Sequence, residues 1–129
     1  MNRIDLPDAE AMAIGLLKAA LPGVRVSTNL PNPRVSKMVR VSRIGGPRLS
    51  MLMDKAQLLL ECYATSSVDA HRLACDAHEV IYAARNSTVI GSARIKATDP
   101  TGPVNFPDPD APDMERYQFT ASLNVRLAG

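Results

Sequence analysis

Residues 56–85 constrain the fold more than any other part of the sequence, because a strand-like segment there runs directly into an amphipathic helix. In the first part, AQLLLECYA, apolar residues recur at every second position, as on one face of a β-strand. In the second part they recur every three or four positions, which is the period of a helix with one apolar side. The residues on that side are Leu73, Ala77, Val80, Ile81 and Ala84. Such a helix needs an apolar sheet beneath it.

The ends of this helix can also be predicted. Ser66 or Ser67 can serve as its N-cap, and Asp69 falls in the first turn, where a carboxylate favours the positive end of the helix dipole. An earlier helix is expected from about residue 7 or 8 to residue 21, where Pro22 and Gly23 end it.

The remaining strands are expected at residues 24–28, 35–44, 92–98 and 116–127, with a link at 87–91. The last strand alternates apolar and polar residues throughout, which is typical of an antiparallel strand with one face on the core. The order is therefore α-β-β-β-α-β-β. It predicts an α+β fold, a two-layer sandwich with two helices on one face of a mostly antiparallel sheet.

The whole chain, residues 1–129, is expected to form a single domain with two extended loops, at about 45–55 and 99–115. The first loop is apolar at its tip, and adaptable methionines there would suit a partner. The second contains five prolines between residues 99 and 113 and cannot form a helix or a central strand. We predict that these loops form a subunit or tube interface through Arg48, Leu49, Met51, Leu52, Met53, Val104, Phe106, Asp108, Asp110 and Asp113.

The net charge of +2 conceals two oppositely charged segments. Residues 24–55 carry seven basic side chains and one acid, Asp54, whereas residues 99–115 carry five acids and no base. These segments can meet within one chain, or between copies in head-to-tail assembly, or both can be solvated.

A set of basic residues falls on the face of the strands that points away from the core. These residues are Arg40, Arg94, Lys96, Arg116 and Arg126. This face can be an ordinary solvated surface, can receive a neighbouring subunit's acidic loop, or can contact nucleic acid through charge alone. The chain has no Trp and few aromatic residues, which argues against a protein that stacks on single-stranded bases.

The only cluster that suggests chemistry lies on the second helix. His71, Cys75 and His78 share one stripe with Tyr82, and Cys62 on the preceding strand could join them. These residue types suit zinc or a Cys–His nucleophile, but half-buried His and Cys are also common as packing residues. No C-x-x-C, G-x-S-x-G, P-loop or G-x-G-x-x-G motif is present. We therefore expect no catalytic site, metal or cofactor, and we expect reduced cysteines, although the sequence does not fix their redox state.

No apolar run approaches the roughly 20 residues of a membrane span. The first ten residues lack the apolar core of a signal peptide, so synthesis in the cytoplasm without membrane association is expected.

The order of several short segments resembles a known family. The chain carries VRVST, a broken loop and VRVSRIGGP, then DKAQLLLECYA, the helix SSVDAHRLACDAHEVIY and two further strands. Over about residues 1–127 this pattern resembles the tail terminator (neck or minor tail) proteins of long-tailed bacteriophages, particularly those of actinobacterial hosts.

The resemblance implies a structural virion protein without catalytic residues. Such subunits form a ring, typically a homohexamer, that caps the tail tube, stops its polymerisation and joins it to the head–tail connector, while genomic DNA passes through the centre. An alternative of the same kind is another neck component, a head-completion or stopper connector. An alternative of a different class is a small metal- or thiol-dependent enzyme that uses His71, Cys75 and His78.

Overall fold

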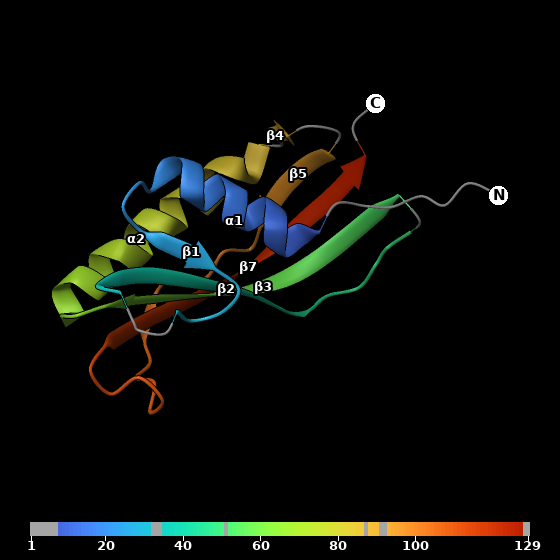
Figure 1. Ribbon diagram of the computed structural model, residues 1–129. Coiled ribbons are helices and arrows are strands. Elements are labelled where there is room, and N and C mark those ends of the chain that lie inside the picture. Colours follow the sequence, from blue (N-terminus) through green and yellow to red (C-terminus); the bar gives the residue numbers. More distant parts are fainter. Residues whose placement is uncertain (1–7, 32–34, 51, 87, 91–92, 128–129) are drawn as a thin grey trace.

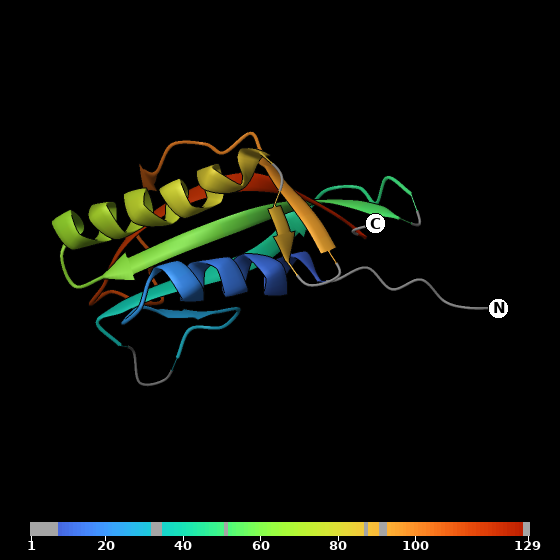
Figure 2. The same cartoon turned by 90° about the horizontal axis from the view of Figure 1, so that it is seen from above.

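A computed structural model describes residues 8–31, 35–50, 52–86, 88–90 and 93–127. Two helices, α1 (Ala9–Ala20) and α2 (Ser67–Ala83), lie over a curled β-sheet (Figure 1). Seen from above, the two helices lie side by side on the same side of the long central strands (Figure 2). The fold is therefore α+β, as the sequence predicts.

The sheet is mixed and contains two strands that the sequence analysis missed. Its strands are β1 (Arg25–Ser27), β2 (Lys37–Gly45), β3 (Met53–Ala64), β4 (Thr88–Ile90), β5 (Ala93–Thr98), β6 (Val104–Asn105) and β7 (Glu115–Leu127). Their spatial order is β1-β2-β3-β7-β5-β4, with β6 also paired to β7. β1 runs parallel to β2, and the other pairs are antiparallel.

The predicted order α-β-β-β-α-β-β contains seven of the observed elements, including the short β1, but omits β4 and β6. The segment predicted as a link at residues 87–91 contains β4, and the proline-rich loop contains β6. These strands have three and two residues, too few to show a periodic pattern, and they form only because β5 and β7 offer an edge to pair with.

The centre of the sheet is the antiparallel pair of β3 and β7, which is continuous from Met53 opposite Arg126 to Ala64 opposite Glu115. The other edge of β7 pairs with β6 near the start of β7 and with β5 near its end. Between them, the Thr101 N–H donates to the Thr120 carbonyl at 2.8 Å. The start of the proline-rich loop thus follows the edge of β7, where residues without an N–H are tolerated.

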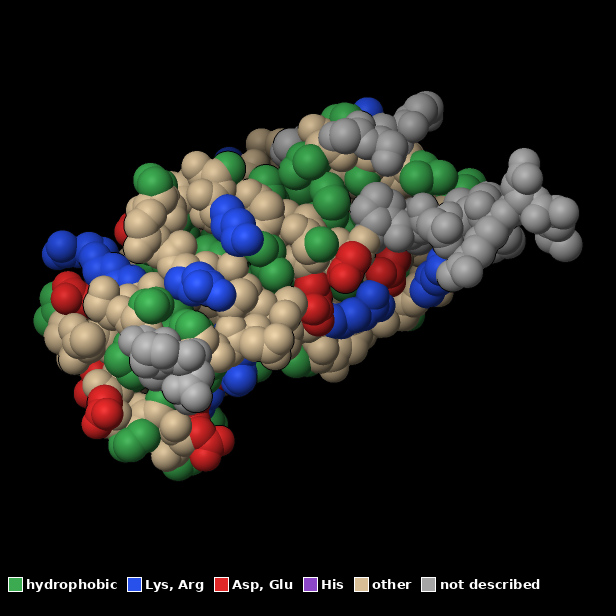
Figure 3. Space-filling model, viewed as in Figure 1, with side chains coloured by type: hydrophobic (Ala, Val, Ile, Leu, Met, Phe, Trp, Pro, Cys, Tyr) green, Lys and Arg blue, Asp and Glu red, His purple; other side chains and the backbone are tan. Residues whose placement is uncertain are grey.

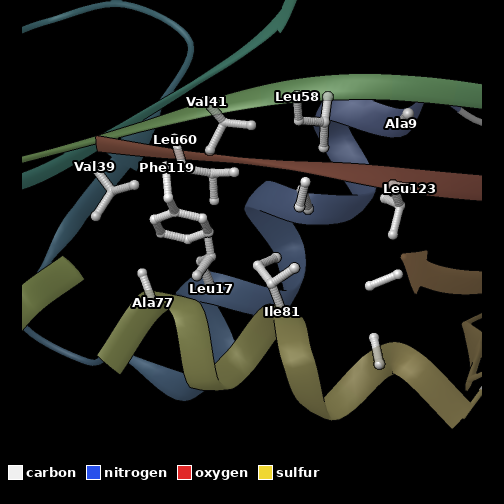
Figure 4. Packing of buried hydrophobic residues seen from close by; sticks show 14 of the residues in the cluster. Ala9, Leu17, Val39, Val41, Leu58, Leu60, Ala77, Ile81, Phe119 and Leu123 are labelled. Carbon is white, nitrogen blue, oxygen red and sulfur yellow. The ribbon is translucent and has the colours of Figure 1, made fainter. Parts of the chain in front are cut away.

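The main core lies between the helices and the sheet. Figure 4 shows Leu17 and Ile81, from the two helices, directed toward Phe119 and Leu60 of the central strands. The apolar face predicted for the strand before α2, which is β3, is confirmed, because Ala56, Leu58, Leu60, Cys62 and Ala64 are all buried. Burying an aliphatic side chain is worth about 1.5–3 kcal/mol, so this layer is the main source of stability.

Both helix N-termini have side-chain caps. Asp8 accepts a hydrogen bond from the Glu10 N–H at 2.9 Å, and Ser66 accepts one from the Asp69 N–H at 3.2 Å. Of the two serines that the sequence offered, the structure selects Ser66. None of the helices in the described residues is long and apolar enough to cross a membrane.

Candidate functional site

The outer face of the sheet, opposite the helices, is divided into a covered end and an open end. At the covered end the proline-rich loop, residues 99–114, folds back below the sheet (Figure 1). A second, smaller apolar cluster forms there from Met38, Tyr63 and Ala111, with Leu30 and Met114 packed against it. The loop is therefore held against its own sheet.

A buried ion network lies beside this cluster. Glu61 is 2% exposed and binds two arginines from neighbouring strands. Arg40 donates Nε to Oε1 at 2.8 Å and Nη2 to Oε2 at 3.0 Å, and Arg116 donates Nη1 to Oε2 at 2.6 Å. The hydrogen bonds that Arg40 donates to the Glu61 carboxylate raise the pKa of Arg40 above its ordinary value. Sheet register creates this network, because Arg40 lies directly opposite Glu61.

Asp108 connects the loop to the network. The Tyr63 hydroxyl donates to Asp108 Oδ2 at 2.8 Å, the Asp110 N–H donates to Oδ1 at 2.9 Å, and Arg116 lies 3.6 Å away. Burial alone would raise the pKa of Asp108, but these hydrogen bonds and the Arg116 charge outweigh it and lower that pKa. Burial, reinforced by the bond to Asp108, raises the pKa of Tyr63. Arg116 also donates Nε to the Phe106 carbonyl at 2.6 Å.

The open end of the outer face is basic. Register places Arg126 between Met53 and Arg94 in one row, and Asn124 between Lys55 and Lys96 in the next. A hollow of about 280 Å³ lies here, which we call the basic hollow. Its lining residues are Met53, Arg94, Lys96, Asn124 and Arg126, and Lys55 lies beside Asn124.

Of the five residues predicted on a basic sheet face, two are paired with a buried carboxylate and three lie together in the open. Arg94, Lys96 and Arg126 lie together at the open end. Arg40 and Arg116 are bound to Glu61 at the covered end, and Arg116 is only 8% exposed. The alternation of residues along each strand correctly predicts that these side chains lie on the outer face of the sheet. It could not show that the proline-rich loop covers one end of that face.

The hairpin arm, residues 45–55, joins β2 to β3 and is well defined at its base. Gly46 has φ +91°, and a Cβ at this position would lie 2.1 Å from the Lys55 carbonyl oxygen. The Arg43 guanidinium binds both Asp54 carboxylate oxygens, at 2.6 and 2.8 Å, which raises the pKa of Arg43. This base fixes the direction in which the arm leaves the sheet.

The tip of the arm exposes apolar side chains. Leu49 is 54% and Leu52 is 52% exposed. Arg48 is also exposed and donates Nε to the Ser50 carbonyl at 3.0 Å. Met53 begins β3, and Met51 lies outside the described residues.

The other residues predicted at an interface lie on the proline-rich loop. Val104 and Phe106 are more than half exposed, and Asp110 and Asp113 are exposed, whereas Asp108 is engaged in the network. Figure 3 shows acidic side chains at the end of the molecule that this loop forms.

The stripe on α2 is explained by packing. The His71 ring meets Tyr117 edge-on at 5.1 Å, and the His78 ring meets Phe119 edge-on at 5.3 Å. Cys75 Sγ lies 3.7 Å from His71 Nε2. The hollow beside His71, about 390 Å³, is lined by Ser67, Val68, His71, Arg72 and Tyr117, and Cys75 is not among them.

Cys62 does not contribute a reactive thiol to this stripe. It is fully buried, and burial raises the pKa of its thiol, which disfavours the thiolate needed for attack or metal binding. Within the part of the chain that the structure describes, no group of three or more His, Cys, Asp or Glu side chains could hold a metal ion.

Sequence reasoning missed Glu61 and Tyr63, which organise the covered end. A signal was present, because Glu61 interrupts an otherwise apolar run, LLLECYA, in which a carboxylate needs a cationic partner. The partners lie 21 and 55 residues away, so the sequence alone could not identify them.

Comparison with known proteins identifies the family. No curated protein matches the chain. The family model described as "phage tail termination protein" matches residues 5–128, which is nearly the whole sequence. Since the match covers both helices, the sheet, the hairpin arm and the proline-rich loop, this chain belongs to the phage tail termination protein family, a structural family of the phage tail.

Proposed function

We propose that the chain is a tail terminator: it forms a ring, typically of six copies, on the end of the tail tube, stops tube polymerisation and provides the surface to which the head–tail connector binds. The observation that carries this proposal is the family match over residues 5–128. The chain would be made in the host cytoplasm and act in the virion tail as one domain, residues 1–129, without cofactor. Genomic DNA would pass through the ring without being read by sequence.

The exposed residues suggest which surfaces make contact. A monomeric protein gains nothing from holding Leu49 and Leu52 in water on an ordered arm, so we assign this tip to a subunit or tube interface. Arg48 and Met53 extend this surface along the arm, and the proposed interface also includes Met51, which lies outside the described residues. Val104 and Phe106 form a second apolar pair on the proline-rich loop. Both apolar pairs lie next to charged side chains, as at the rim of many interfaces.

The test is tube polymerisation in the presence of the purified chain. The cognate tail tube protein is assembled with wild-type chain, with Leu49→Asp/Leu52→Asp, or with the control Val68→Asp, which changes a residue on α2 that is 67% exposed. We expect wild type and the control to give short tubes with a ring at one end in electron micrographs. The Leu49→Asp/Leu52→Asp variant should leave long, uncapped tubes.

Tubes that grow to the same length with and without wild-type chain would contradict the proposal. If particles instead carry the chain only on the portal side, the alternative of a head-completion or stopper connector would be favoured.

A further inference from the structure

Two oppositely charged surfaces lie at opposite ends of the outer face. The acidic tip, Asp110 and Asp113, is exposed on the proline-rich loop beside the start of β7. The basic hollow lies at the other end of the same strand, at Asn124 and Arg126 of β7. From Glu115 to Arg126 an extended chain spans about 37 Å, at about 3.4 Å per residue. The acidic tip of one chain therefore cannot reach its own basic hollow, and these charges can meet only between copies.

The basic hollow has unmet charge. Lys96 lies opposite Asn124, two positions before Arg126 on the same face of β7, so Lys96 and Arg126 are diagonal cross-strand neighbours of like charge. Among the described residues, no carboxylate forms an ion pair with Lys55, Lys96 or Arg126. Bringing anionic side chains into the hollow would relieve the repulsion between these like charges.

The hollow also has an unmet hydrogen-bond acceptor. Asn124 Oδ1 is buried and has no hydrogen-bond partner within the described part of the chain. Thr98 lies in the neighbouring row, and its buried hydroxyl also has no hydrogen-bond partner among the described residues. Both atoms are buried and therefore not accessible to a ligand, so the exposed charges of Lys96 and Arg126 determine what the hollow binds. A loop that carries carboxylates matches these charges.

The loop that carries the acidic tip is held in position for such a contact. Ala111 lies buried between Asp110 and Asp113, and Asp108 is fixed by Tyr63 and Arg116. The loop thus presents the two exposed carboxylates on a supported backbone, which lowers the entropy lost on binding.

We propose that the acidic tip of one copy, through Asp110 and Asp113, binds in the basic hollow of the next copy, against Lys96, Arg126 and Asn124. This inference rests on the proposed ring function and names the contact that would close the ring. A contact between two different surfaces is head-to-tail, and repetition of such a contact closes a ring when its rotation permits.

Charge reversal on each side tests the contact. Lys96→Glu/Arg126→Glu reverses the hollow, and Asp110→Lys/Asp113→Lys reverses the tip. Matched controls reverse exposed charges elsewhere: Arg25→Glu/Arg72→Glu, and Asp76→Lys/Glu79→Lys on α2. Circular dichroism and thermal melting establish that each variant is folded. Self-association is measured by sedimentation velocity and native mass spectrometry, alone and on tail tubes.

We expect each reversal alone to weaken association by about tenfold or more, as for close charge pairs at other interfaces. The controls should associate as wild type does. An equal mixture of the two reversed variants should assemble again, because each tip then meets a hollow of opposite charge. Its rings should contain the two variants in alternation, with an even number of copies.

Three results would overturn the inference. If both reversed variants form rings as well as wild type, the ring contact lies elsewhere and the proposed function survives. If Lys96→Glu/Arg126→Glu assembles normally but loses affinity for a random-sequence DNA duplex, the hollow is a nucleic-acid surface. If wild type remains monomeric even on tubes, the inference is overturned together with the proposed ring.

Discussion

The two ends of the outer sheet face share the central strands β3 and β7, and their polar side chains point to the same side of the sheet, yet the charges are paired at one end and exposed at the other. At the covered end, Arg40, Glu61 and Arg116 pair beneath the proline-rich loop. At the open end, Lys96 and Arg126 remain exposed. The difference depends on where the loop lies, and not on the strands themselves.

This comparison shows how one small sheet can separate a structural charge cluster from a surface available to partners. Buried charges are costly unless each one is paired, so the covered end must be complete within the chain. Exposed charges are solvated and contribute little to folding, so the open end can be arranged for contact with another molecule. Substitutions at the covered end should therefore change the stability of the fold, whereas substitutions at the open end should change association with other molecules.

The largest effect is expected for Glu61→Gln. Removing this charge breaks the 2.6 Å pair with the buried Arg116 and leaves it only the more distant Asp108 carboxylate at 3.6 Å, and breaking a buried pair costs about 3–5 kcal/mol. The midpoint of urea unfolding should fall strongly. The control Glu79→Gln, on the exposed side of α2, should leave it unchanged. Equal midpoints for the two variants would show that the covered end does not depend on its ions.

A moderate effect is expected for Tyr63→Phe. This change removes the hydroxyl that donates to Asp108 at 2.8 Å and leaves the aromatic ring in its apolar cluster. A hydrogen bond to a charged group contributes about 1.5–3 kcal/mol. Amide hydrogen exchange should increase mainly in residues 99–114, and an increase confined to the helices would contradict this assignment. Tyr117→Phe, on the helix side of β7, is the matched control.

A smaller, pH-dependent effect is expected at Asp108. Because the pKa of Asp108 is lowered in the folded chain, its stabilising contribution is complete above the unfolded value of about 3.9 and is lost as the pH falls through the lowered folded value. Wild type should therefore be more stable than Asp108→Asn at neutral pH. The difference in urea midpoint should shrink in acid, and a difference that is independent of pH would refute this account.

The smallest effect on stability is expected at the open end. Lys96→Glu/Arg126→Glu should change the free energy of unfolding by no more than about 0.5 kcal/mol, as for most surface substitutions. The same variant should nevertheless lose self-association. A strong loss of stability here would mean that the two ends do not differ in the way proposed.

Much of the fold could be predicted from local sequence, because each signal lies within one element. A serine at residue 66 or 67 was predicted to cap the second helix, and the alternation from Phe119 to Val125 gives β7 its buried face. The boundaries of α1 and α2 follow from the same signals. The missed strands, β4 and β6, have almost no local signal of their own and exist through pairing.

The candidate surfaces could be predicted only in part. The apolar tip at Leu49 and Leu52 was visible as an apolar run after a turn, and the two charged segments were visible as blocks. Arg116 was placed on the correct face of its strand but with the wrong exposure, because nothing near it in sequence shows that Asp108 and Phe106 cover it.

The sequence by itself determined the two helices, the long strands with their buried faces, and the separation of basic from acidic segments, since period and capping act over a few residues. Only the tertiary structure decided which charged side chains become buried and paired within the chain. Sheet register brings Arg40 and Arg116 to Glu61 from 21 and 55 residues away, and the folded loop closes over them. The free energy of a charge depends on its surroundings in space, which no local stretch of sequence specifies.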